Sequence, residues 1–444
     1  MRTSRRRFLL RTGAAFVAVP FTGFPAVVKR RNANELLSHA SIGVGGMGLS
    51  DLNELRPHHA INITALCDVD SNNLERAKKL CPGARIYRDA FEMFAAEGDR
   101  IDSVNVATPD HTHAQYILEA LRRGQNVYAQ KPICHDLVDC RRILDATHKS
   151  KAVTQMGTQI AAWECDRATV AAIRSGTVGE IRHVWLFSTR RDDPGSDYYR
   201  WPLEPAPVPK TLEWRLWLGP VQYRPYVPKV YHPGEWRRWR AFGSSWLGDL
   251  GLHLMSPVWL GMDLGTSHPL SVIAEISDDG FNDDQRREFW PGNSHITWKM
   301  PGVKASGGKP FTVEWCDGFE SARFRMEPKF MPPAFLQDVA ALTPAGKLPL
   351  EGRMIEGEKG WILSTHVFAG PHYVMKDGRK PPAIPLAGAR CNHRFEYVDC
   401  CIGGGKPTSS FEWTLAMNEM MLLGNRAMLQ PDMKLTLKKK DGNV

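Results

Sequence analysis

The chain has 444 residues, of which 43% are hydrophobic and 24% are charged, and it contains 38 glycines and 31 prolines. This composition is that of an ordinary globular protein, and it excludes a disordered, collagen-like or coiled-coil chain. Because a single hydrophobic core seldom organises more than about 300 residues, the length predicts two domains.

The net charge of +9 comes almost entirely from residues 1–31, which contain eight basic residues and no acidic residue. The remaining chain has 49 basic and 48 acidic residues, so we expect no nucleic-acid partner. A basic run near the C-terminus predicts a solvated tail over residues 431–444. The nine cysteines show no C-x-x-C spacing, so we expect neither a disulfide framework nor a structural zinc site.

Residues 1–31 are typical of a twin-arginine export signal. A moderately apolar stretch over residues 13–28 follows a basic start, Ser4-Arg5-Arg6-Arg7-Phe8-Leu9-Leu10. This stretch is shorter than the roughly 20 residues of a membrane span, so no stable span is expected in the mature protein. We predict recognition by the Tat export machinery and a periplasmic or otherwise exported location. A disordered basic N-terminus without a targeting role is the alternative, and cleavage of the signal stays open because no small-x-small site is evident.

Strands and helices are predicted to alternate up to about residue 156. Helix-like stretches near 47–56, 71–81, 111–123 and 135–148 separate apolar runs at 40–44, 61–67, 102–107, 126–129 and 152–156. Such βαβ alternation predicts an α/β fold that begins with a Rossmann-type, doubly wound parallel sheet.

A glycine-rich motif lies between the first predicted strand and the first helix: Gly43-Val44-Gly45-Gly46-Met47-Gly48. In this G-x-G-x-x-G pattern, Gly43 permits a tight turn, Gly45 lets the backbone approach a pyrophosphate, and Gly48 allows close packing of helix on strand. Asp68 follows about 20 residues later at the end of the second strand, where a carboxylate accepts hydrogen bonds from the adenosine ribose. A carboxylate there repels a 2′-phosphate, so NAD is favoured over NADP. The alternative is a glycine-rich turn beside a helix-capping aspartate.

A second motif follows the predicted strand at 102–107: Ala107-Thr108-Pro109-Asp110-His111-Thr112-His113. Asp110 precedes an amphipathic run, so we predict that it caps a helix at the carboxyl edge of the sheet. Because ligands of open α/β sheets gather at that edge, Thr108, Pro109, His111 and His113 are predicted to line the nucleotide site. No metal is predicted there.

Lys131 lies at the end of the next predicted strand, in Gln130-Lys131-Pro132, and therefore beside the same crevice. An ammonium group near a nicotinamide and a substrate hydroxyl stabilises developing alkoxide charge. The alternative is an exposed lysine at a strand end.

The pattern changes after residue 180. Alternating runs at 181–187 and 311–315 predict antiparallel strands with one exposed face. Between them, residues 192–245 are loop-rich and combine aromatic rings with arginines, a mixture that suits a carbohydrate but equally suits a packed core or subunit contact. The aromatic residues, including Trp246 just after this range, are Tyr198, Tyr199, Trp201, Trp214, Trp217, Tyr226, Trp236, Trp239 and Trp246. The arginines are Arg200, Arg215, Arg224, Arg237, Arg238 and Arg240.

Taken together, these motifs resemble those of the Gfo/Idh/MocA oxidoreductases, specifically their exported branch. The resemblance runs from about residue 38 to 430 and includes Gly248-Asp249-Leu250-Gly251-Leu252-His253, Ile355-Glu356-Gly357-Glu358-Lys359-Gly360 and Gly405-Lys406-Pro407-Thr408-Ser409-Ser410. It implies a Rossmann dinucleotide-binding domain over 38–156, followed over 157–430 by an α/β domain with a large, mostly antiparallel open sheet that carries substrate-facing residues and an oligomer interface. We therefore expect a homo-oligomer.

In proteins of this family the lysine of the K-P motif meets the aspartate and histidine of a D-x-x-x-H motif around the nicotinamide and substrate. The matching residues here are Lys131, Asp249 and His253. Residues four apart on a helix share one face, so Asp249 and His253 can point into the same cleft. The resemblance implies that His253 is the general base, that Asp249 binds substrate or orients the imidazole, and that Lys131 polarises the substrate oxygen. A helix cap and a core histidine are the alternative reading of Asp249 and His253.

Three features depart from the family pattern. Gln130 replaces the usual glutamate before the motif lysine, which removes a negative charge near Lys131. Ser256 stands where many relatives have an aspartate three residues after the motif histidine. The chain also stops soon after Lys440, so a closing helix or strand is expected to be absent.

The sequence thus predicts an exported NAD-dependent oxidoreductase that transfers hydride between a tightly bound nicotinamide cofactor and a small-molecule sugar, sugar derivative or polyol. One alternative is an NAD-dependent glycoside hydrolase that oxidises the sugar transiently. A second is a non-catalytic carbohydrate-binding protein on the same scaffold, suggested by Gln130 and Ser256. The identity of the sugar and the carbon oxidised stay open.

Overall fold

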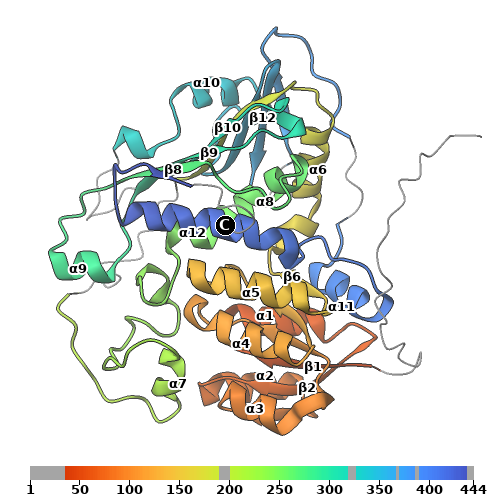
Figure 1. The fold of residues 1–444 in the computed structure, drawn as a ribbon, viewed down its shortest axis with the longest axis vertical. Coiled ribbons are helices and arrows are strands. Elements are labelled where there is room, and N and C mark those ends of the chain that lie inside the picture. Colours follow the sequence, from red (N-terminus) through yellow and green to blue (C-terminus); the bar gives the residue numbers. More distant parts are fainter. Residues whose placement is uncertain (1–35, 190–200, 319–326, 367–369, 386–389, 438–444) are drawn as a thin grey trace, which may run out of the picture.

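The computed structural model describes residues 36–189, 201–318, 327–366, 370–385 and 390–437. The predicted export signal over 1–31 lies outside the described residues, as do Tyr198, Tyr199 and Arg200. Figure 1 shows two α/β units, one built on each of two sheets, with the long helix α12 (Phe411–Met428) crossing between them.

The first unit is a six-stranded parallel sheet with the order β3-β2-β1-β4-β5-β6, which confirms the Rossmann-type prediction. Strand β3 and helix α3 were not predicted, because β3 is only three residues long and largely exposed. The strands are β1 (Leu37–Ile42), β2 (Ile61–Cys67), β3 (Arg85–Tyr87), β4 (Ser103–Val106), β5 (Asn126–Ala129) and β6 (Thr154–Met156). The helices are α1 (Gly46–Leu55), α2 (Ser71–Leu80), α3 (Ala90–Glu97), α4 (Asp110–Arg122) and α5 (Leu137–Lys149).

The strand order of this sheet reverses between β1 and β4, both of which are buried. Every residue of β4 is buried, including Val104 and Val106 at 0% exposure. Central strands of a parallel sheet are covered on both faces, which explains their continuous apolar character. At the reversal point the loops after β1 and β4 turn to opposite sides, and this opens a crevice at the carboxyl edge of the sheet.

The second unit is an eight-stranded mixed sheet with the order β13-β12-β11-β7-β10-β9-β8-β14. Six of its seven pairings are antiparallel, which confirms the predicted mostly antiparallel sheet. Strands β7 and β10 are each antiparallel to another neighbour but run parallel to each other, which was not expected. Alternation of apolar and polar residues reports one covered face and carries no information on strand direction. The strands are β7 (Ile181–Ser188), β8 (Ser271–Ile276), β9 (Ser294–Met300), β10 (Phe311–Asp317), β11 (Glu351–Gly357), β12 (Gly360–Thr365), β13 (His372–Met375) and β14 (Leu435–Thr436).

One face of the second sheet packs on helices, and the central one is α12. This helix is buried on nearly all sides, because it contacts both α5 of the first unit and β8 and β9 of the second. The other helices of this half are α6 (Glu164–Arg174), α7 (Trp214–Leu218), α8 (Leu252–Gly261), α9 (Asp283–Glu288), α10 (Phe335–Ala341) and α11 (His393–Gly403). Short 3-10 turns are η1 (Gly98–Arg100), η2 (Gln159–Ala162), η4 (Glu235–Arg238), η6 (Lys304–Ser306) and η7 (Pro328–Phe330), and η5 (Leu247–Gly251) is a π-helical turn.

The C-terminal part of the described chain contains the helix α12 and then the short strand β14, which pairs with β8. Within the stretch predicted as a solvated tail, Leu435–Thr436 form β14 at the edge of the sheet, and 438–444 lie outside the described residues. Two strand residues are too short a run to stand out in a sequence dominated by lysine.

Residues 201–246 form an extended segment, here called the aromatic segment, whose side chains form a core together with Phe281 and Phe289. Trp214 and Trp217 stack at a centroid distance of 4.8 Å, and Tyr231 packs edge-on to Trp239 at 4.7 Å. Most of its rings thus form a packed core, which was one of the two interpretations of the sequence. No helix among the described residues is long and apolar enough to cross a membrane.

Candidate functional site

The glycine-rich turn after β1 is shaped by two very close backbone approaches. Gly43 has φ +79°, and a Cβ there would lie 2.7 Å from the carbonyl oxygen of Ala107. A Cβ on Gly48 would lie 1.7 Å from the carbonyl oxygen of Gly43. The first turn of α1 begins at Gly45 with no side-chain cap, so its N–H groups are free of side-chain acceptors and can bind a phosphate.

Asp68, at the end of β2, is fixed by the turn that precedes α1. Its Oδ2 accepts a hydrogen bond from the Val44 N–H at 2.8 Å, and its Oδ1 accepts one from the Asp70 N–H at 2.9 Å and one from Asn73 Nδ2 at 3.2 Å. Burial raises the pKa of Asp68, and these hydrogen bonds act against that rise. The residue that caps α2 is Asp70, so the alternative of a helix-capping role for Asp68 is wrong.

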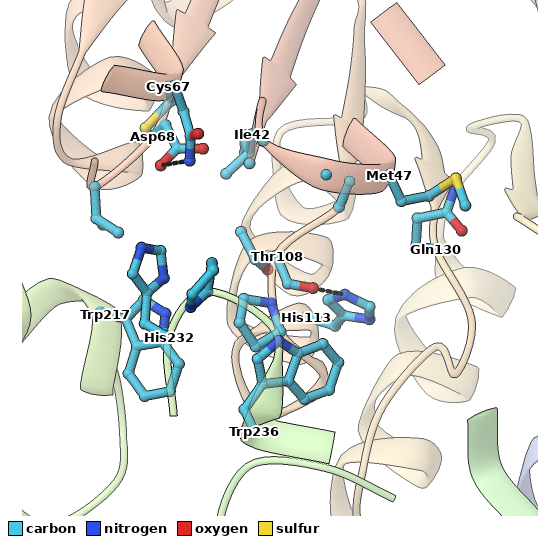
Figure 2. A pocket seen from close by; sticks show the side chains of 18 of the residues that line it. Ile42, Met47, Cys67, Asp68, Thr108, His113, Gln130, Trp217, His232 and Trp236 are labelled. Atoms are coloured by element: carbon cyan, nitrogen blue, oxygen red, sulfur yellow. Dashed lines mark hydrogen bonds between the residues drawn. The ribbon is translucent and has the colours of Figure 1, made fainter. Parts of the chain in front are cut away.

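A cavity of about 550 Å³ extends from this turn along the carboxyl edge of the first sheet. Figure 2 shows it between the Rossmann residues and side chains of the aromatic segment, with Trp217, His232 and Trp236 facing Asp68 and Thr108. The predicted site residues on its wall are Gly43, Gly45, Gly46, Met47, Asp68, Thr108, Pro109, His113 and Lys131. Four predicted site residues do not line it: Gly48, His111, Asp249 and His253.

The two histidines at the start of α4 contact backbone carbonyl oxygens around the cavity. His111 Nε2 lies 3.1 Å from the carbonyl oxygen of Trp217, which joins α4 to the aromatic segment. The ring of His113 lies between the carbonyl oxygens of Pro132 and Thr108, at 2.7 Å and 2.6 Å. Burial lowers the pKa of both histidines, that of His111 to about 3. His111 is therefore a neutral, structural contact beside the cavity.

Asp110 does not cap α4 as predicted, because the helix begins one residue earlier. Pro109 is the N-cap, and the Oδ2 of Asp110 accepts a hydrogen bond from the Ser244 N–H at 3.1 Å. Asp110 lines the cavity although it is buried. Burial raises its pKa to about 6, against the opposing charges of Lys131 and Arg237. Asp110 is thus a site residue that the sequence interpretation missed.

Lys131 and Asp249 come from different halves of the chain and meet at the cavity. Lys131 Nζ donates a hydrogen bond to the backbone oxygen of Asp249 at 2.8 Å and forms an ion pair with its Oδ1. Arg237 Nε approaches the same Oδ1 at 3.4 Å. Burial alone raises the pKa of Asp249, but the charges of Lys131 and Arg237 outweigh burial and hold it below its usual value. Asp249 is therefore a carboxylate shared by two cations.

His253 lies one turn further on, in α8, and Asp249 lies in the π-helical turn η5 that precedes it. Burial, and then the charge of Lys131, lowers the pKa of His253 well below its usual value, so the ring is neutral. Its Nδ1 is buried without a hydrogen-bond partner among the described residues, and its ring centroid is 5.4 Å from that of His366. A neutral imidazole with an unused nitrogen is the state a proton acceptor requires.

The side-chain amide of Gln130 belongs to a buried hydrogen-bond network beside the cavity. Its Nε2 donates to Asp51 Oδ2 at 2.7 Å, and its Oε1 accepts from Gln159 Nε2 at 3.1 Å. Asp51 also accepts hydrogen bonds from Arg394. A glutamate at position 130 would place a carboxylate against that of Asp51, so the amide is the side chain that this network accommodates.

The aromatic segment is held across the cavity by contacts with the Rossmann unit. The carbonyl oxygen of Thr211 accepts hydrogen bonds from the Ser71 N–H at 2.9 Å and from Arg88 at 2.7 Å. The Glu213 N–H donates to the carbonyl oxygen of Val69 at 2.9 Å. His232 Nε2 lies 3.4 Å from Asp70 Oδ2. Sequence reasoning found the aromatic composition, but these mostly backbone contacts leave no pattern in the residue types.

Two family profiles match the chain, one over the first unit and one over part of the second. The oxidoreductase family with an NAD-binding Rossmann fold, Gfo/Idh/MocA, matches residues 37–158, and the C-terminal alpha/beta domain of the same family matches residues 198–286. Together they cover the glycine turn, Asp68 and Lys131 in one match, and the aromatic segment with Asp249 and His253 in the other.

Individual proteins are similar over parts of the chain. An inositol 2-dehydrogenase of Azotobacter vinelandii is 31% identical over 31% of this chain and 41% of its own length. A glycosyl hydrolase family 109 protein of Phocaeicola vulgatus is 25% identical over 32% of this chain and 36% of its own length. The chain thus aligns with less than half the length of these curated relatives. The structure of the WlbA dehydrogenase from Bordetella pertussis, in complex with NADH and UDP-GlcNAcA, superposes with a TM-score of 0.60 and 14% identity over 91% of this chain and all of that one. The two profile matches, one in each unit, assign the matched parts of the chain to the Gfo/Idh/MocA oxidoreductase family.

Proposed function

We propose that the protein binds NAD(H) in the cavity and transfers hydride between the nicotinamide and a CH–OH carbon of a sugar, sugar derivative or polyol. The observation that carries the proposal is Lys131, which pairs with Asp249 and lines a cavity that begins at the glycine turn. The uncapped start of α1 fits a pyrophosphate, and Asp68 fits a ribose. The inositol 2-dehydrogenase relative supports a polyol or sugar substrate.

Lys131, Asp249 and His253 would each have a different role in the proton transfer. Lys131 lines the cavity, and its ammonium group would donate a hydrogen bond to the reacting oxygen and stabilise negative charge there. Asp249 holds that ammonium group in place through its backbone oxygen and its carboxylate. His253, a neutral ring in the helix that follows Asp249, would accept the hydroxyl proton. The bound cofactor supplies the hydride acceptor.

We further propose that the cofactor is NAD and that it stays bound through the catalytic cycle. The carboxylate of Asp68 at the ribose position disfavours a 2′-phosphate. The aromatic segment is bound across the cavity through Thr211, Glu213 and His232, so a nucleotide beneath it would leave slowly.

An NAD-dependent glycoside hydrolase is the second candidate, favoured by the same retention of the cofactor and by similarity to the Phocaeicola vulgatus protein.

We also propose export by the Tat machinery and assembly into a homo-oligomer. The basic, acid-free segment 1–31 supports export. The second sheet has half-buried polar side chains such as His295 and Glu314 on the face turned away from α12, which supports assembly. Replacing Arg5 and Arg6 by lysine is expected to block export of the whole protein. Light scattering measures the molar mass of the assembly and so tests the homo-oligomer.

The first test is to purify the protein without added cofactor, denature it and identify released nucleotide by absorbance and mass spectrometry. Near-stoichiometric NAD(H) is the expected result. Failure to release or bind any nicotinamide nucleotide would overturn the proposal.

A second test separates the two enzymatic candidates. The protein is incubated with polyols including myo-inositol, with free sugars and with glycosides, and both NADH formation and sugar release are followed. Net oxidation supports the dehydrogenase, and sugar release without net redox change supports the hydrolase. His253→Ala is expected to abolish either reaction while nucleotide content stays nearly unchanged.

A further inference from the structure

We propose that Arg237 is a positioning residue for the reacting centre, which shares the carboxylate of Asp249 with Lys131 and so leaves the Lys131 ammonium group available to the cavity. This inference rests on the proposed function. Arg237 belongs to the aromatic segment, and it lies outside the three-residue set of Lys131, Asp249 and His253 that the family resemblance implies.

The position of Arg237 is fixed from several sides. Its Nε lies 3.4 Å from Asp249 Oδ1, and its Nη1 donates to the carbonyl oxygen of Gly234 at 3.2 Å. Its guanidinium carbon lies 4.4 Å from the ring centroid of Trp236. A Cβ on Gly243 would lie 2.6 Å from the Cα and carbonyl oxygen of Arg237, so the two backbones are in close contact. The side chain therefore approaches Asp249 from a rigid base.

The two cations compete for a single carboxylate oxygen. Lys131 Nζ and Arg237 Nε both approach Oδ1 of Asp249, whose side chain is 22% exposed. A carboxylate shared between two cations holds each of them less strongly than it would hold one alone. Because Lys131 and Arg237 both line the cavity, this sharing keeps the Lys131 ammonium group available to a developing alkoxide.

The other titratable groups around Asp249 do not replace Arg237. His253 follows on α8 and is neutral, and Asp110 on α4 is a second acid, so it adds negative charge. Removing Arg237 would leave Lys131 as the main partner of Asp249, and the pKa of Asp249 would rise because one of the two cations that lower it is lost. Arg237 thus links the seating of the aromatic segment to the charge of the reacting centre.

The test compares Arg237→Gln and Arg237→Lys with a matched control, Arg240→Gln. Arg240 lies in the same segment, but its Nη1 donates to the carbonyl oxygen of Arg286 at 2.6 Å and it does not line the cavity. Reductive methylation with formaldehyde and a borohydride reductant, followed by peptide mass spectrometry, measures the reactivity of Lys131 without any substrate. In Arg237→Gln we expect Lys131 labelling to fall at least about threefold, because the ammonium group pairs more tightly with Asp249. Arg237→Lys should restore most of the labelling, and Arg240→Gln should not change it.

A second readout uses whichever substrate the panel identifies. In Arg237→Gln the acidic limb of the kcat profile should move up by about one pH unit, and kcat should fall more than the nucleotide affinity. Unchanged Lys131 labelling with an unshifted acidic limb would overturn the role of Arg237, as would an equal effect of Arg240→Gln. If wild-type protein turns over no substrate, the proposed function fails, and the labelling result still decides whether Arg237 shares Asp249 with Lys131.

Discussion

At the scale of single residues, the site depends on a lysine whose partner is far away in sequence. Lys131 ends a strand of the first sheet, and Asp249 lies 118 residues later in η5. The side chain of Lys131 is 14% exposed. Its contacts with the backbone oxygen and the carboxylate of Asp249 direct the ammonium group along the cavity wall. The catalytic contribution of Lys131 is therefore expected to be electrostatic, with a smaller part in holding nucleotide.

Lys131→Met keeps the length of the side chain and removes its charge. We expect kcat to fall by about 10²- to 10⁴-fold, because the ammonium group proposed to donate to the reacting oxygen is lost, and NADH affinity measured by fluorescence to change little. Lys299→Met, on the half-covered strand β9, is the matched control and should retain full activity. Activity of Lys131→Met within threefold of the wild type, an interval of about 0.7 kcal/mol, would contradict the assignment.

At the scale of elements, the glycine turn joins β1, α1 and the loop after β4. Gly48→Ala would insert a methyl group 1.7 Å from the Gly43 carbonyl oxygen and 3.1 Å from the Ala107 side chain, so α1 would have to move away from the sheet. We expect loss of nucleotide binding and a destabilisation of about 2 kcal/mol or more. Gly83→Ala, where nothing lies within 4 Å, is the control. Nucleotide content and thermal unfolding measure both effects, and equal behaviour of the two variants would show that the turn is less constrained than its geometry implies.

The second sheet contains a row of charged pairs across β7, β10, β9 and β8. Glu314 contacts His183 Nε2 at 2.8 Å and His295 Nε2 at 3.0 Å, and Glu275 lies 3.4 Å from His295 Nδ1. Burial lowers the pKa of His295, but Glu314 and Glu275 outweigh burial and raise it above 6.5. Burial likewise raises the pKa of Glu314, while the two histidines lower it to about 2.

This row predicts a pH dependence of stability. A raised pKa means that His295 contributes its full stabilisation below pH 6.5 and loses it as the pH rises through the folded-state value. We expect the wild type to lose of the order of 1 kcal/mol over that rise, discounted for partial exposure, and His295→Gln to lose less. Urea unfolding at a series of pH values above 6 measures the difference. Parallel curves for the two proteins would show that the row does not stabilise the sheet.

Element positions show what sequence patterns can and cannot convey. Continuous apolar runs and glycine spacing predicted β1, β2, β4 and the turn at Gly43, because burial on both faces and backbone crowding constrain residue type directly. The parallel pairing of β7 with β10 was not predicted, since alternation records a covered face only. The cap of α4 was placed on Asp110, yet that side chain accepts from the Ser244 N–H, a tertiary partner 134 residues away.

At the scale of the whole molecule, helix α11 of the C-terminal half is anchored on α1 of the Rossmann unit by a buried ion pair. Arg394 Nη2 donates to Asp51 Oδ1 at 2.7 Å, with side chains that are 6% and 0% exposed, and Arg394 Nη1 donates to Glu54 at 3.0 Å. Burial raises the pKa of Asp51, and the charge of Arg394 opposes that rise. The same carboxylate accepts from Gln130, so the packing of the two units and the cavity floor share one group.

Arg394→Met would leave the carboxylate of Asp51 buried without its cation. Breaking a buried pair from one side typically costs about 3–5 kcal/mol, so we expect a destabilisation of that size in urea unfolding, with a weaker cofactor site because Gln130 loses its fixed partner. The double variant Asp51→Asn with Arg394→Met should recover much of the loss, since a neutral amide oxygen can still accept from Gln130 and Asn105. Arg379→Met, in an ion pair whose arginine is 77% exposed, is the control and should cost little. A loss in Arg394→Met no larger than in Arg379→Met would mean that apolar packing alone, around residues such as Tyr397 and Val398 of α11, joins the two units.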